Sequence, residues 1–178
     1  RIKEDYLRIL RYIRFFLNYS KIKHNLEIIK KIKLNIYGIV KLSKERLLDE
    51  LKKIVKVDIL EKLSKDDIAL NLISIIFPEL KNIKIFSKLT SDQKEILRKP
   101  DFIFLLSLMI IDESDNADYF LYKFKVPKKE KERIKIIDDF FKEKVNKKTF
   151  IESNLNRILY YYGREAVLDI LNFRIIKL

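Results

Sequence analysis

The chain has 178 residues and a formal net charge of +13, and it contains no cysteine, which excludes disulfides and thiolate metal sites. Hydrophobic residues make up 48% of the sequence, enough to build a core and too many for a disordered chain. Only two glycines and three prolines interrupt segments rich in Leu, Ile, Lys and Glu, so the composition predicts an almost purely helical protein.

The apolar spacing in the first third of the chain predicts three helices. The first covers residues 4–18 and buries a stripe made of Tyr6, Leu7, Leu10, Ile13 and Leu17. A second helix is expected over residues 24–35, and Gly38 then breaks the pattern. A third is expected to run to about residue 55 with Ser43 as its N-cap.

Shorter helices are expected in the remainder of the chain. Three segments resemble capping boxes and mark helix starts: Ser64-x-x-Asp67, Thr90-x-x-Gln93 and Thr149-x-x-Glu152. Further boundaries are predicted at Pro78, at Pro100 before the apolar run 102–111, at the polar turn 112–116, at Pro127 before a charged amphipathic helix over 128–143, and at Gly163 between the last two helices.

The first sixteen residues carry an acidic pair, Glu4 and Asp5, ahead of three arginines at three-residue spacing, Arg8, Arg11 and Arg14. On a helix, Asp5 and Arg8 would be i,i+3 neighbours, which brings an acceptor and a planar donor into the same space. Cytosine and adenine show an amino donor beside a ring-nitrogen acceptor, whereas uracil and guanine show the reverse order. A fixed pair would therefore accept C and A, since an unpaired buried group costs roughly 1–3 kcal/mol. The alternative is a solvated helix salt bridge.

The pattern Glu4-Asp5-x-x-Arg8-x-x-Arg11-x-x-Arg14-Phe15 resembles the nucleobase-recognition motif of class II tRNA nucleotidyltransferases (CCA-adding enzymes) and of the related bacterial poly(A) polymerases. The segment from Ser43 to Leu51 is similar to the next motif of that family, whose Arg and Glu four residues apart brace the recognition helix. Weaker similarities follow at residues 77–80 and 159–169.

The resemblance implies an all-α, irregular multi-helix array in three parts: a neck over 1–56, a body over 57–126 and a tail over 127–178. The family's catalytic head, with its Gly-Ser phosphate loop and metal-binding aspartates, has no counterpart here, because neither Gly38 nor Gly163 lies in such a context. The chain by itself is therefore expected to be inactive, to contain no catalytic residue and no metal site, and to bind no cofactor. Magnesium is implied only for the head.

The resemblance also assigns roles to individual residues. Those implied to bind the nucleotide are Glu4, Asp5, Arg8, Arg11 and Arg14, with Asp5 and Arg8 as the base template. Arg46 and Glu50 are expected to brace the recognition helix through partners on other helices, because Arg before Glu is the poorer order for a pair within one helix. The alternative for Arg14 is an exposed charge beside Phe15.

The positive charge favours a polyanionic partner, although an A/T-rich genome also enriches Lys and Ile. The candidates for RNA contact are Lys125, Lys128, Lys129 and Arg164, and the alternative for this region is a solvated face, because Glu130 and Glu132 interrupt it. Of Tyr160, Tyr161 and Tyr162, at least one is expected in the core, and another could stack on a base. His24 has no nearby second ligand and is expected on the surface at a helix start.

The function that the sequence predicts is that of the C-terminal helical part of a CCA-adding tRNA nucleotidyltransferase. The alternatives are the same part of a bacterial poly(A) polymerase, or a stand-alone helical RNA-binding module. The expected partners are tRNA or another RNA 3′ end, ATP, CTP and an N-terminal head domain of the same polypeptide. A membrane partner is not expected, because no apolar run reaches ~18 residues and no signal peptide is visible, and the expected location is the cytoplasm.

Overall fold

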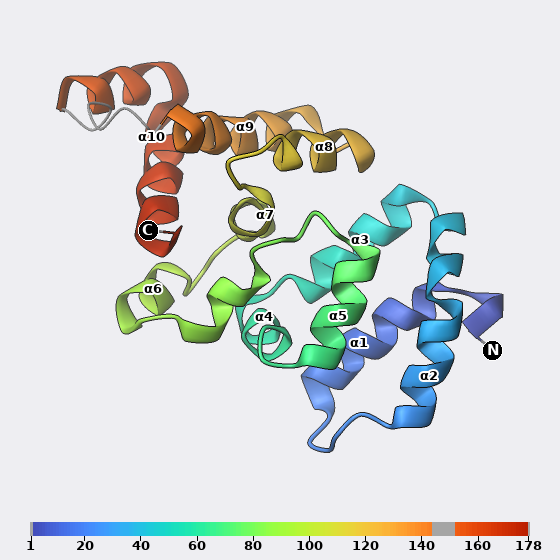
Figure 1. Cartoon of the computed structure of the whole chain (residues 1–178). Helices are drawn as coiled ribbons and strands as arrows, with labels where there is room; N and C mark the ends of the chain where they lie inside the picture. The colour runs from blue at the N-terminus through green and yellow to red at the C-terminus, as the bar shows by residue number, and fades with distance from the viewer. Residues whose placement is uncertain (1, 144–151, 178) are drawn as a thin grey trace. The chain divides into compact units, whose positions relative to one another are not determined.

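The computed structural model describes residues 2–143 and 152–177, and the elements within these ranges are α-helices and 3-10 helices without any strand. Figure 1 shows this irregular helical array, which confirms the predicted fold class. The chain divides into two compact units, Arg1–Ser87 and Lys88–Leu178. The division into neck, body and tail stays a prediction.

The first unit is built around α1, which packs on both α3 and α4. The buried side chains of α1 are Leu7, Ile9, Leu10, Ile13 and Leu17, so the predicted stripe is largely correct, with Ile9 added and Tyr6 only half-buried. The elements that begin in this unit are η1 (Ile2–Glu4), α1 (Leu7–Tyr19), α2 (Leu26–Asn35), η2 (Ile36–Lys41), α3 (Lys44–Ile54), α4 (Val57–Leu63), α5 (Asp67–Ile76) and η3 (Ile83–Lys88).

Side-chain caps start several of these helices. The Ser43 hydroxyl accepts a hydrogen bond from the backbone N–H of Arg46 at 3.3 Å, which confirms the predicted N-cap of α3. The predicted capping box at Ser64 is wrong. Ser64 ends α4, where its hydroxyl donates to the Glu61 carbonyl, and the cap of α5 is Asp66, which accepts from the N–H of Ala69 at 2.9 Å. The predicted N-cap, Ser64, lies two residues before the observed N-cap, Asp66.

His24 is not a surface residue, contrary to the sequence-based expectation. Its side chain is 5% exposed, and its ring stacks on Phe16 with centroids 3.5 Å apart. The two ring nitrogens lie 2.9 Å from the Tyr12 hydroxyl and 2.9 Å from Asp66 Oδ2. His24 therefore links α1, which carries Tyr12 and Phe16, to the carboxylate that caps α5.

Gly38 lies where η2 approaches the segment before α1. A Cβ at this position would overlap the ring of Tyr6, so the close contact between η2 and Tyr6 requires glycine. The break that the sequence predicted at Gly38 is a 3-10 segment rather than an open loop. This contact holds the chain just ahead of α1 against η2.

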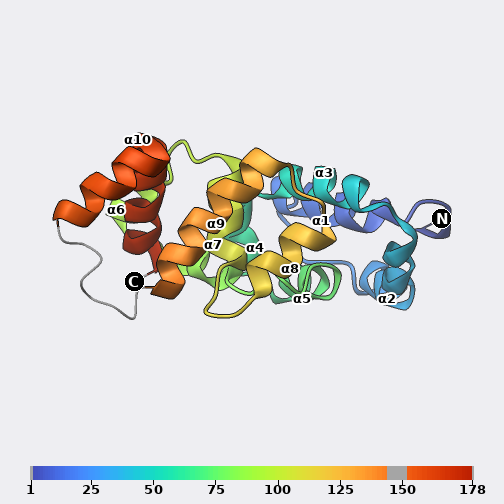
Figure 2. The same cartoon turned by 90° about the horizontal axis from the view of Figure 1, so that it is seen from above.

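The second unit is organised around α9, which packs on α7, α8 and α10, and α9 lies beside α8 in both views (Figures 1 and 2). The apolar run predicted from Phe102 forms α7, in which eight of nine residues are buried. The capping box at Thr90 is confirmed, and Pro127 directly precedes α9 as predicted. The helices of this unit are α6 (Ser91–Ile96), α7 (Phe102–Ile110), α8 (Asn116–Lys123), α9 (Lys128–Glu143) and α10 (Glu152–Lys177).

Arg133 ties three helices of this unit together. Its guanidinium makes two hydrogen bonds with Asp169 of α10, at 2.6 and 2.9 Å, and lies 2.7 Å from the carboxylate of Asp101, which caps α7. The hydrogen bonds with Asp169 raise the pKa of Arg133 further above its ordinary value, even though burial opposes the shift. Arg133 is therefore a structural link between α9, α10 and the start of α7.

The last helix, α10, is kinked at Gly163, whose φ of 79° is unfavourable for any residue with a side chain. This confirms the predicted separation into two helical segments. The expectation that one of Tyr160, Tyr161 and Tyr162 lies in the core is wrong, because all three are exposed. Among the residues of α10 whose burial is described, from Asn156 onward, the buried ones come after the kink. The predicted capping box at Thr149 lies outside the described residues.

Across residues 2–143 and 152–177, no helix combines the length and the apolar character that a bilayer span requires.

Lys177 gives this unit a pH-dependent contribution to stability. Its ammonium donates to the Ile111 carbonyl at 2.7 Å and lies 5.6 Å from the centroid of Phe141, and burial lowers its pKa from 10.5 to about 8, with Asp112 opposing. The unfolded chain then binds more protons than the folded chain between about pH 8 and 10.5. The free energy of unfolding relative to Lys177→Met should therefore rise across this window, as measured by urea denaturation at several pH values. A difference that stays constant with pH would contradict the assignment.

Candidate nucleotide-binding site

The acidic pair at the start of the chain lies ahead of the first helix instead of inside it. Glu4 ends η1, and α1 begins at Leu7, so the expectation of a helix from residue 4 is wrong by about one turn. The reason is local. The carboxylate of Asp5 accepts a hydrogen bond from the backbone N–H of Leu7 at 3.1 Å, which satisfies a donor that the first turn leaves unpaired.

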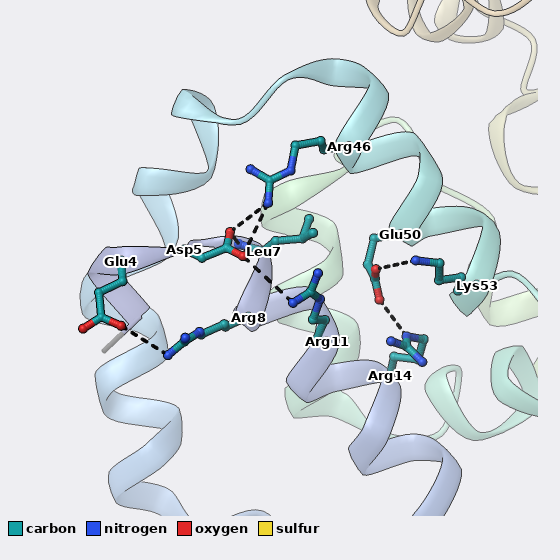
Figure 3. A network of polar contacts seen from close by, with 9 residues as sticks. All are labelled: Glu4, Asp5, Leu7, Arg8, Arg11, Arg14, Arg46, Glu50 and Lys53. Carbon is teal, nitrogen blue, oxygen red and sulfur yellow. Dashed lines mark hydrogen bonds and ion pairs between the residues drawn. The ribbon is translucent and has the colours of Figure 1, made fainter.

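The carboxylate of Asp5 is held by two arginines from different elements (Figure 3). Nη2 of Arg46, on α3, lies 3.2 Å from Oδ1 and 3.4 Å from Oδ2, and Nη1 of Arg11 lies 4.0 Å from Oδ2. The Asp5 side chain is 26% exposed, and the two arginine side chains are about half exposed. Asp5 is thus fixed in position while it remains accessible from solvent.

Arg8 points its guanidinium toward Glu4, with 3.6 Å between Nη1 and Oε2 (Figure 3). Both side chains are about half exposed or more, so this ion pair contributes little to stability. The expected direct pairing of the Asp5 and Arg8 side chains as neighbours on one helix is not the arrangement seen, because Asp5 precedes the helix. The acid and the guanidinium still lie in the same short segment, with Asp5 just ahead of α1 and Arg8 in its first turn.

Glu50 is the buried end of this network. Its side chain is 1% exposed, and its two oxygens are taken by Nε of Arg14 at 2.6 Å and by Nζ of Lys53 at 3.2 Å (Figure 3). The Arg14 side chain is 21% exposed, and its guanidinium carbon lies 4.4 Å from the centroid of the Phe15 ring. Arg46 and Glu50 both contact residues outside α3, Arg46 through Asp5 and Glu50 through Arg14 of α1, and their role in bracing a recognition helix stays a prediction.

The three arginines form a line along α1, and their exposure increases from Arg14 to Arg8. Arg14 is paired with a buried carboxylate, Arg11 lies near the half-buried Asp5, and Arg8 is half exposed beside Glu4. Such a line offers a fixed acceptor together with several guanidinium donors to a ligand, and guanidinium groups suit both base edges and phosphate oxygens. The arrangement can therefore recognise a nucleotide. Its role as a base template stays a prediction.

The candidates for RNA contact lie in the other unit. Lys125 is in a left-handed conformation (φ 49°) at the turn after α8, and Lys128 and Lys129 are exposed in the first turn of α9, where Lys128 lies 3.9 Å from Glu132. Arg164 is exposed directly after the kink of α10. Their part in RNA binding stays a prediction.

Two contributions to the site region were missed from sequence. Lys53 shares Glu50 with Arg14, which its i,i+3 spacing from Glu50 on α3 could have indicated. His24 anchors α1 from the other side, and no sequence signal connects it with Asp66. In the part of the chain that the structure describes, no group of three or more His or acidic side chains could hold a metal ion. The magnesium implied by the family resemblance stays an expectation about a catalytic head.

No protein-family model matches this chain. The chain is 32% identical, over 137 residues, to the protein of Mus musculus named CCA tRNA nucleotidyltransferase 1, mitochondrial. The match covers 74% of this chain and 30% of the mouse protein, so the similarity spans less than a third of that relative. It supports a relationship of this chain to tRNA nucleotidyltransferases.

The buried carboxylate of Glu50 should dominate the stability of this region. Glu50→Ala leaves Arg14 without its partner in a poorly solvated position, and we expect a loss of about 3 kcal/mol in the free energy of unfolding. The matched control is Lys53→Ala, which removes the more exposed partner and should cost less than about 1 kcal/mol. Chemical denaturation measures both. Equal effects of the two substitutions would show that the Arg14 contact is not the main link between α1 and α3.

Proposed function

We propose that this chain selects the incoming nucleotide in a CCA-adding tRNA nucleotidyltransferase. The observation that carries the proposal is the carboxylate of Asp5, which the Leu7 N–H and Arg46 hold in one orientation while it stays partly exposed near Arg11, with Arg8 three residues further along the chain. The similarity to a protein named as a CCA tRNA nucleotidyltransferase supports the substrate class.

Base choice in this proposal depends on hydrogen-bond complementarity. Asp5 accepts from the amino group that C and A share, and Arg8 donates to the neighbouring ring nitrogen. U and G would place an acceptor against Asp5 and a donor against Arg8, and each unpaired group costs roughly 1–3 kcal/mol. Glu4 orients Arg8, and Arg11 extends the donor surface toward the ribose and the phosphates. Arg14 is the least accessible of the three arginines to the nucleotide, because it is paired with Glu50.

Magnesium and nucleotidyl transfer belong, in this proposal, to a catalytic head of the family type. The residues described here would bind and orient the base. The partners are CTP and ATP together with the 3′ end of a tRNA, and Lys125, Lys128, Lys129 and Arg164 are candidates for holding that RNA.

Replacing Asp5 by Asn tests the proposal with little disturbance to the fold, because the amide oxygen can still accept from the Leu7 N–H. We expect discrimination against U and G to fall by roughly five- to a hundredfold, the equivalent of one or two unpaired groups. The measurement is incorporation of each of the four nucleotides into tRNA by the full-length protein that carries this chain. The control is Asp49→Asn, an exposed carboxylate on α3 with no ion pair among the described residues.

Unchanged discrimination in the Asp5→Asn protein would reject the template. Parallel reactions on tRNA that lacks its 3′ end and on an oligoadenylate primer separate CCA addition from poly(A) synthesis. The absence of incorporation into either RNA by the unaltered protein would favour a non-catalytic RNA-binding module.

Arg46→Ala should act through the position of Asp5. The half-exposed pair contributes less than about 1 kcal/mol, so the melting temperature should change little. Incorporation should nevertheless fall, by up to about a hundredfold, because small errors in the position of a recognition group are costly. Arg46→Lys should restore only part of the loss, since an ammonium lacks the planar fork. Wild-type kinetics in the Ala variant would show that Arg46 is a surface charge.

A further inference from the structure

The positive charge of this protein is unevenly divided between its two units. Residues 1–87 contain 20 lysines and arginines against 11 acidic residues, a formal charge of +9, whereas residues 88–178 contain 19 against 15, a charge of +4. The segment 21–44 alone has seven lysines and a single acidic residue, Glu27. Most of the electrostatic attraction for a polyanion therefore originates in the first unit.

Part of this charge lies on an exposed side of α2. Ile29 and Ile32 are buried against the unit, and the side next to them presents Leu26, Lys30, Lys33 and Leu34, which lie within about 100° of one another on a helix with 3.6 residues per turn. We call these four residues the outer α2 face. Figure 1 shows α2 beside the N-terminal segment, with η2 leading on to α3.

The lysines of this region have no acidic partner within the described residues. Lys30, Lys31 and Lys33 are exposed and take part in no ion pair there, even though Glu27 is on the same helix. The second unit differs, because Lys128, Lys135 and Lys142 are all paired with carboxylates. Unpaired lysines that are already clustered gain most from a polyanion, since binding releases the counterions around it.

Large exposed apolar side chains flank these lysines in the sequence. Leu26 and Leu34 are 74% and 75% exposed, and Tyr37 and Val40 of η2 are 76% and 74% exposed. Large side chains left this open and close together commonly mark an interaction surface. An aromatic ring beside a cationic helix face is the combination with which proteins bind single-stranded nucleic acid, because the ring stacks on a base and the cations follow the backbone.

We propose that the outer α2 face and Tyr37 bind a single-stranded segment of RNA, with phosphates at Lys30 and Lys33 and one unpaired base stacked on Tyr37. The inference rests on the proposed function in that an RNA is the acceptor substrate there. It assigns to the first unit a contact with RNA that is separate from the nucleotide site around Asp5 and from the lysines of α9.

The test uses the whole 178-residue chain and a fluorescent single-stranded RNA of about 12 nucleotides, within the site sizes known for such surfaces. Affinity is measured by anisotropy between about 50 and 200 mM salt. Lys30→Gln combined with Lys33→Gln should weaken binding at low salt and make the plot of log affinity against log salt shallower by about 1.4, at roughly 0.7 for each single-strand phosphate contact. The matched control is Lys62→Gln with Lys65→Gln, two exposed lysines of the same unit.

Tyr37→Ser separates stacking from charge. It should weaken binding by roughly five- to a hundredfold and leave the salt slope unchanged, because stacking involves no counterion release. Circular dichroism of each variant checks that the helices are retained. A duplex of the same sequence should lose the Tyr37 effect, since its bases are already stacked.

Four results would overturn the proposal. One is an unchanged affinity in the Lys30/Lys33 variant, and another is an equal loss in the Lys62/Lys65 control. The third is a shallower slope for Lys128→Gln with Lys129→Gln but not for Lys30 and Lys33, which would move the RNA contact to α9. If Leu34→Ser alters the oligomeric state in sedimentation and not RNA affinity, the face joins copies of this chain instead.

The outcome is independent of the nucleotide site. Base discrimination by the Asp5→Asn protein and RNA affinity of the Lys30/Lys33 variant are separate measurements, so the expected change in one and an unchanged value in the other shows which of the two proposals has failed.

Discussion

The contact between Glu50 and Arg14 is the interaction on which the candidate site depends. A carboxylate that is 1% exposed must be matched by cations, and Arg14 supplies one from α1 while Lys53 supplies another from α3 itself. Because Arg8, Arg11 and Arg14 follow one another at three-residue steps on a single helix, fixing Arg14 also fixes the directions of the other two. The buried ion pair and the apolar stripe of α1 thus act together in orienting α1 against α3.

A second set of contacts, made by His24, also holds α1 in place. Tyr12 and Phe16 meet His24, whose ring also reaches the carboxylate of Asp66 at the start of α5. Asp66 thus caps a helix with one oxygen and contacts His24 with the other. With α3 on one side and His24 on the other, α1 presents Arg8 and Arg11 from a rigid support, which is what recognition by hydrogen-bond geometry requires.

Charge is used differently in the two units. In the second unit, Arg133, Lys135 and Lys142 of α9 pair with carboxylates of other elements, as Arg133 does with Asp101 and Asp169. In the first unit, the lysines of α2 remain exposed without acidic partners among the described residues. The same residue types therefore have structural roles in one place and are free to attract a polyanion in another, and composition alone does not distinguish the two.

The sequence by itself determined the helical class, the N-caps at Ser43 and Thr90, the apolar helix from Phe102 and the kink at Gly163, because periodicity, capping chemistry and glycine conformation act within a few residues along the chain. It also indicated that Arg46 and Glu50 contact other elements, since their order disfavours a pair within α3. Only the tertiary structure decided that Asp5 lies outside α1 and is held by Arg46, that His24 is buried, and that Tyr160 to Tyr162 are exposed. These properties depend on which residues from distant segments meet, such as Asp5 with Arg46 or His24 with Asp66, and such meetings leave no periodic signal in the sequence.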